Sequence, residues 1–96
     1  MILQDVINYL EELAPPSYQE SYDNGGLIIG DASCAFTKAI ICLDSTEEVV
    51  DEAVAKGANI IIAHHPIIFN GLKKLNGSNY VERTVIKAIK HDIAIY

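Results

Sequence analysis

Two adjacent histidines followed by a proline, His64, His65 and Pro66, are the residues of this sequence best suited to chemistry. Neutral imidazole is the side chain that most often binds transition metals in proteins. Pro66 favours an extended backbone at His65, so the two side chains are expected to diverge and to bind one metal ion each. The alternative is a pair of polar loop residues that hold no ligand, and the residues alone leave that alternative open.

Two histidines do not complete a metal site, because catalytic zinc usually takes three protein ligands and a dinuclear site needs bridging carboxylates. Asp44 and Asp23 are the carboxylates that could lie near the histidines. Either could be a ligand, an orienting partner of a ligand, or a base. Asp44 could equally support the start of a helix, and Asp23 fits an Asx-turn residue better than a ligand. We assign no catalytic residue from the sequence.

The segments around the histidines predict the elements that position them. Continuous apolar runs at 38–43 and 59–63 are typical of strands covered on both faces, and 93–96 is expected to form a third strand. Helical patterns separate these runs, so we expect an α/β fold of parallel βαβ units with right-handed connections. His64 then follows a strand at the carboxyl edge of the sheet, where open α/β sheets bind their ligands.

The expected helices have recognisable ends. Ser45 and Glu48 match a capping box, with the Ser45 hydroxyl accepting the Glu48 amide, and that helix is expected to end at Gly57. Asn79 and Glu82 form a similar pair before the next helix. A first helix is predicted from the apolar residues at positions 3, 6, 7, 10, 13 and 14. Residues 27–29 are expected to form a short strand closed by a glycine.

Composition narrows the classes of function. The chain has 96 residues, half of them hydrophobic, and a net charge of −6, which allows one thin-cored domain and favours association with a partner. The acidic balance argues against direct nucleic-acid binding. Cys34 and Cys42 are expected to be reduced core thiols. No apolar run approaches the ~20 residues of a membrane span and no basic leader is present, so we expect a cytoplasmic protein without membrane contact.

Three motifs in this sequence resemble the amino-terminal part of the NIF-three-like family, whose members are named as GTP cyclohydrolase I type 2 homologues. They are Tyr22-Asp23-Asn24-x-Gly26-Leu27-x-x-Gly30, Leu43-Asp44-x-Thr46-x-x-Val49-Val50-x-Glu52-Ala53, and His64-His65-Pro66-x-x-Phe69-x-Gly71. They occur in family order along nearly the whole chain, and the His-His-Pro-x-x-Phe block is the most specific. Tyr22 stands where the family often has tryptophan.

The resemblance implies a dinuclear site in which His64 and His65 each bind one of two divalent ions: zinc, iron or manganese. It also implies a homo-oligomer, a hexamer in complete members, and a metal-dependent hydrolase acting on a nucleotide-like or other small polar substrate. A non-catalytic metal-binding scaffold is the alternative. The family's His-Thr-x-x-Asp and His-x-x-x-Glu ligand blocks have no counterpart here. Residues 1–96 are therefore expected to form a single incomplete α/β domain, inactive by itself, with its histidines empty or loosely occupied.

Overall fold

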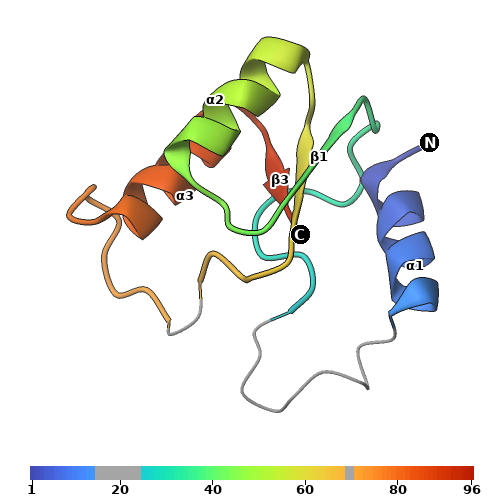
Figure 1. The fold of residues 1–96 in the computed structure, drawn as a ribbon, viewed down its shortest axis with the longest axis horizontal. Helices are drawn as coiled ribbons and strands as arrows, with labels where there is room; N and C mark the ends of the chain where they lie inside the picture. The colour runs from blue at the N-terminus through green and yellow to red at the C-terminus, as the bar shows by residue number, and fades with distance from the viewer. Residues whose placement is uncertain (15–24, 69–70) are drawn as a thin grey trace.

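A computed structural model (Figure 1) describes residues 1–14, 25–68 and 71–96 and has the predicted α/β architecture. Each strand lies within the range expected for it, and the first helix forms where the apolar stripe predicts it. No described helix is long and apolar enough to cross a membrane. The elements in chain order are α1 (Leu3–Leu13), β1 (Ala39–Cys42), α2 (Glu47–Lys56), β2 (Ile60–Ala63), α3 (Tyr80–Lys90) and β3 (Ala94–Ile95).

The three strands form one parallel sheet in the order β1-β2-β3. Ala39 pairs with Ile60 and Cys42 with Ala63, while residues 60 and 61 pair with residues 94 and 95 of β3. Helix α2 connects β1 to β2, and α3 connects β2 to β3, which confirms the two predicted βαβ units. Because all strands run the same way, β1 and β2 end side by side at one edge.

The two faces of the sheet bury different side chains, because side chains alternate along a strand. Figure 1 shows α2 and α3 together on one side of the sheet and α1 on the other. The core beneath α2 and α3 includes Val50, Ala53, Ile61, Val85, Ala88 and Ile95. The opposite face holds a smaller cluster, in which Leu3 of α1 packs on Ile60 and Ala94.

Strand β1 is less covered than its apolar sequence predicts. Ile40 and Cys42 pack against the helix-side core, but Ile41 is 80 % exposed, so the expectation that this strand is covered on both faces is wrong. The physical reason is position. β1 is at the edge of the sheet, and the buried contact of α1 on this face, made by Leu3, is with Ile60 of β2 and Ala94 of β3.

The start of α2 also differs from the prediction by one residue. Thr46, not Ser45, is the N-terminal cap, and its hydroxyl accepts a hydrogen bond from the Val49 N–H at 3.2 Å. Ser45 is only 2 % exposed, and its hydroxyl has no hydrogen-bond partner among the described residues. Two neighbouring hydroxyl residues both suit an N-cap, so the sequence did not distinguish them. Gly57 ends the helix in the left-handed conformation, as predicted.

Residues 27–29 form one antiparallel bridge to β3 instead of the expected strand. Ile29 pairs with Ile95, whose N–H donates to the Ile29 carbonyl at 2.9 Å. Gly30 follows with a φ of +117° and lies against Ala94, where an added Cβ would be 2.5 Å from the Ala94 Cβ. This left-handed turn ends the pairing after one bridge, and both the φ angle and the close contact require glycine.

Candidate metal centre

The histidine pair begins directly after β2, where the chain is still hydrogen-bonded to the end of β1. The N–H of His64 donates to the Cys42 carbonyl at 3.0 Å, and that of His65 donates to the Leu43 carbonyl at 2.9 Å. Both histidines are exposed. The predicted position of the pair, at the carboxyl edge of a parallel sheet, is therefore confirmed.

The two imidazole rings lie together, so the expectation that they diverge is wrong. Their centroids are 4.8 Å apart and their planes are inclined by 62°. The reason is that His64 and His65 lie past the last paired residues of β2, in a bend of the chain, where the strict alternation of a strand no longer separates neighbouring side chains. The arrangement places two nitrogen-bearing rings in one small region of surface.

Asp44 contacts His65, and this contact bears on one of the open interpretations of the aspartate, its support of the helix start. Its Oδ1 lies 2.8 Å from His65 Nδ1, with side-chain exposures of 64 % and 59 %. Extending the pairing of Cys42 with Ala63 by two residues along each strand brings Asp44 opposite His65, as the contact shows. Asp44 does not cap α2, because Thr46 does. It is therefore a hydrogen-bond partner of one histidine rather than a support for the helix.

The cysteines contribute less to this region. Cys42 packs on the core, and burial, reinforced by the negative charges of Asp44 and Glu52, raises the pKa of its thiol above its ordinary value. A protonated thiol is a poor metal ligand. Cys34 is exposed, so its expected place in the core is wrong; its loop packs against the start of α1, and the N–H of Leu3 donates to the Cys34 carbonyl at 2.9 Å.

The donor set among the described residues is partial. No group of three or more His, Cys, Asp or Glu side chains that could hold a metal ion occurs within residues 1–14, 25–68 and 71–96. Asp23 lies outside these ranges, so its part in the site remains a prediction. The two histidines fit a divalent transition metal by donor type, since imidazole suits zinc and iron, but they make only part of a first coordination sphere.

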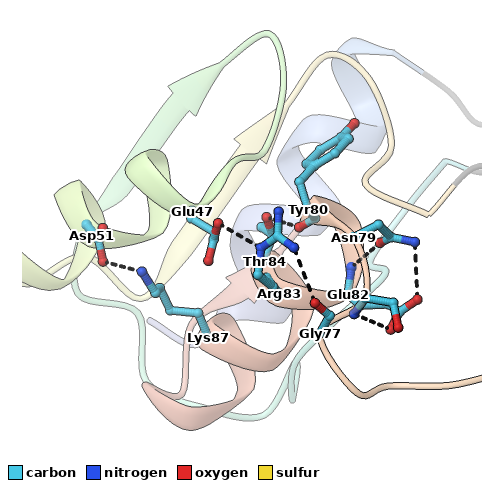
Figure 2. A network of polar contacts seen from close by, with 10 residues as sticks. Glu47, Asp51, Gly77, Asn79, Tyr80, Glu82, Arg83, Thr84 and Lys87 are labelled. Atoms are coloured by element: carbon cyan, nitrogen blue, oxygen red, sulfur yellow. Dashed lines mark hydrogen bonds and ion pairs between the residues drawn. The ribbon is translucent and has the colours of Figure 1, made fainter.

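A second polar region, which sequence reasoning missed, joins α2 to α3 (Figure 2). Arg83 Nε donates to Glu47 at 3.3 Å, and Lys87 Nζ donates to Asp51 at 3.0 Å. Each pair is 36 residues apart in sequence, so no local pattern could have indicated it. The ion pair with Asp51 raises the pKa of Lys87. A hollow of about 310 Å³ along α3 is lined by Glu47, Arg83, Ile86, Lys87, Lys90 and His91.

The loop that follows the histidines is attached to the start of α3. Asn79 caps this helix as predicted, with its side chain accepting from the Glu82 N–H at 2.9 Å. The Glu82 carboxylate in turn accepts the N–H groups of Asn76 and Ser78, both at 3.2 Å. These contacts hold the carboxyl-terminal end of the loop between β2 and α3 in place.

Comparison with known proteins identifies the relatives of this chain. The GTP cyclohydrolase 1 type 2 homolog of Clostridium perfringens is 41 % identical over 96 residues, which is all of this chain and 37 % of that protein. The protein of the same name from Staphylococcus aureus N315 is 44 % identical over 93 residues, or 97 % of this chain and 25 % of the relative. The chain therefore spans between a quarter and two fifths of the length of these relatives.

Solved structures share the fold. A Bacillus cereus protein related to NIF3 superposes with a TM-score of 0.95 at 43 % identity, covering 100 % of this chain and 27 % of that one. HcgD from Methanocaldococcus jannaschii gives a TM-score of 0.90 at 26 % identity, covering 100 % and 38 % respectively. The family model described as Duf34/NIF3 (NGG1p interacting factor 3) matches residues 1–96. On this evidence, the chain belongs to the Duf34/NIF3 family.

Proposed function

We propose that this chain supplies His64 and His65 as ligands to a divalent metal centre in a metal-dependent hydrolase. The observation that carries the proposal is the pair of exposed imidazole rings, 4.8 Å apart, at the carboxyl ends of parallel strands. Metal ligation needs accessible nitrogen donors held close together, and the hydrogen bonds of both histidine backbones to the end of β1 fix where the two residues lie.

We propose two ions, one on each ring, as the family resemblance implies. Ions in dinuclear hydrolytic sites lie about 3.5–4 Å apart, and rings whose centroids are 4.8 Å apart lie close enough to serve two such neighbouring ions. Zinc, iron and manganese all accept imidazole ligands. The chain spans between a quarter and two fifths of the length of these relatives, so the remaining ligands of such a centre are part of the proposal for the whole protein.

A bound divalent ion activates water and polarises the group that the water attacks. The names of the relatives indicate GTP, and we extend the proposal to a nucleotide-like or other small polar substrate. We also propose a homo-oligomer, hexameric in the whole protein, that works in the cytoplasm. The exposed apolar side chains of Ile41 and Leu43 support association, because a partner subunit would bury them.

A second candidate is a non-catalytic metal-binding scaffold. It uses the same pair of exposed imidazole rings and differs from the hydrolase only in lacking turnover. Turnover separates the two candidates. Metal-dependent conversion of GTP by the C. perfringens relative, lost on changing its matching histidines, supports a hydrolase. Bound metal without turnover of any nucleotide supports a scaffold.

The metal proposal is tested by calorimetric titration of zinc or manganese into this chain and its variants. We expect weak binding by the wild type, because each missing donor reduces charge neutralisation and chelation. His64→Ala and His65→Ala should each reduce binding further. His91→Ala is the matched control, since His91 is exposed at the end of α3 and hydrogen-bonds the Lys87 carbonyl.

Two results would contradict this reasoning. Tight, stoichiometric binding by these 96 residues would show that the site is already complete. No binding by the whole protein would remove the metal hypothesis.

A further inference from the structure

We propose that Asp44 is a positioning residue, which holds the His65 imidazole in a single tautomer and leaves Nε2 free to bind a metal ion. The part of this inference that concerns metal binding rests on the proposed function. The tautomer does not, because it is a property of the metal-free chain and can be measured without any metal.

The tautomer follows from the chemistry of the contact. Asp44 Oδ1 lies 2.8 Å from His65 Nδ1. An ionised carboxylate has no proton to donate, so the Nδ1 atom must carry the shared hydrogen. In the neutral ring the remaining lone pair is then on Nε2, which points away from Asp44. Metal-binding histidines commonly use this device, in which a carboxylate fixes both tautomer and ring orientation.

The sheet holds both partners of this contact in register. Pairs between β1 and β2 are offset by 21 residues, from Ala39 with Ile60 to Cys42 with Ala63, and Asp44 and His65 have the same offset. The His65 N–H also donates to the Leu43 carbonyl at 2.9 Å. The backbones on both sides of the Asp44–His65 contact are therefore attached to each other next to it.

The contact is better suited to orientation than to stability. Both side chains are more than half exposed, and ion pairs at such positions contribute little to folding. The contact instead fixes the orientation of the His65 ring. An unrestrained imidazole can rotate and exchange tautomers, whereas a ring held in place keeps its Nε2 atom in one position. This would favour metal binding, since less conformational freedom is lost when the ion binds.

The test uses the 96-residue chain labelled with ¹⁵N at histidine and recorded without metal at alkaline pH, where free imidazole is neutral. Long-range ¹H–¹⁵N spectra then report which ring nitrogen carries the proton. We compare the wild type with Asp44→Ala and with Asp44→Asn, which keeps the size of the side chain but can donate as well as accept. Backbone spectra check that each variant keeps the fold.

We expect His65 to show the Nδ1–H form in the wild type and a mixture of both forms in the two variants. His91 is an internal reference. Its Nδ1 lies 2.9 Å from the Lys87 carbonyl, which also only accepts, so His91 should keep the Nδ1–H form in all three proteins. Zinc affinity should fall by about 10–100-fold in Asp44→Ala, the usual effect of losing such a partner.

Each other outcome has a distinct meaning. A mixture of tautomers at His65 in the wild type, or no change in Asp44→Ala, overturns the positioning role. Loss of zinc binding in Asp44→Ala with an unchanged tautomer would make Asp44 a direct ligand and also overturn it. If zinc fails to bind the whole protein while the tautomer of this chain responds as expected, the proposed function fails and the assignment to Asp44 holds.

Discussion

Replacing Glu82 with alanine should release the end of the loop that begins at the histidines. Glu82 is only 8 % exposed, and its carboxylate accepts three hydrogen bonds: the N–H groups of Asn76 and Ser78, each at 3.2 Å, and the Asn79 amide at 3.1 Å. In the alanine variant, the two backbone N–H groups lose their acceptor and the N-cap loses its reciprocal partner.

The magnitude follows from the geometry. Hydrogen bonds to a charged group contribute about 1.5–3 kcal/mol each, but these are long, and the donors Asn76 and Ser78 are in exposed residues that water can reach. We therefore assign roughly 1 kcal/mol to each backbone bond and expect Glu82→Ala to lower the free energy of unfolding by about 2 kcal/mol. For a domain of this size, that corresponds to a melting temperature lower by about 8–16 °C.

Urea denaturation followed by circular dichroism measures this loss. Glu82→Gln keeps one acceptor oxygen and should lose about half as much, since glutamine also fits this position of a capping box. Glu48→Ala is the control, because Glu48 is exposed on α2 and such surface changes usually stay within about 0.5 kcal/mol. If Glu82→Ala is as stable as Glu48→Ala, the carboxylate does not anchor the loop and this reasoning is refuted.

Two further predictions concern Gly30 and Cys42. Gly30→Ala should lower the free energy of unfolding by about 1–3 kcal/mol, since alanine is strained at a φ of +117° and its Cβ would meet Ala94; thermal melting that matches the wild type would contradict this. The raised pKa of Cys42 means that the folded chain binds the thiol proton more tightly than the unfolded chain. The stability that the Cys42 thiol contributes is therefore fully present below the pKa of the thiol in the unfolded chain. It declines as the pH rises through the higher pKa of the thiol in the folded chain. Urea titrations from pH 8 to 10 should show a steeper loss in the wild type than in Cys42→Ala, and parallel curves would show that the thiol is not linked to folding.

The sequence predicts the parts of this fold that depend on local pattern. The apolar runs and the capping residues Asn79 and Gly57 place each helix and strand, and the alternation of strands and helices puts His64 and His65 at the carboxyl edge. These features need only the periodicity of each segment and the rule that parallel strands end together. The family resemblance adds the identity of the histidines as expected ligands.

The remaining features depend on how segments pair, which local pattern does not contain. The contact of Asp44 with His65 requires the register between β1 and β2, and a shift of one residue would put Asp44 on the other face. Predicting the exposure of Ile41 requires knowing that β1 is the edge strand, because an apolar sequence is the same in an edge strand and in a central strand. The nearness of the two rings depends on a bend beyond the last strand pair.

The position of β1 at the edge of the sheet has a consequence for how the proposed metal centre can be reached. On the side away from β2, the strand presents unpaired backbone donors and acceptors in the described part of the chain, whereas β3 is bridged by Ile29 on its outer side. A strand added to the sheet would therefore attach beside β1, roughly 4.8 Å away. At that distance its end would border Asp44, one strand from the histidines. A strand that extends the sheet would then lie next to the surface where the missing metal ligands are needed. A partner that pairs with β1 would therefore be placed to add a ligand atom to the proposed site.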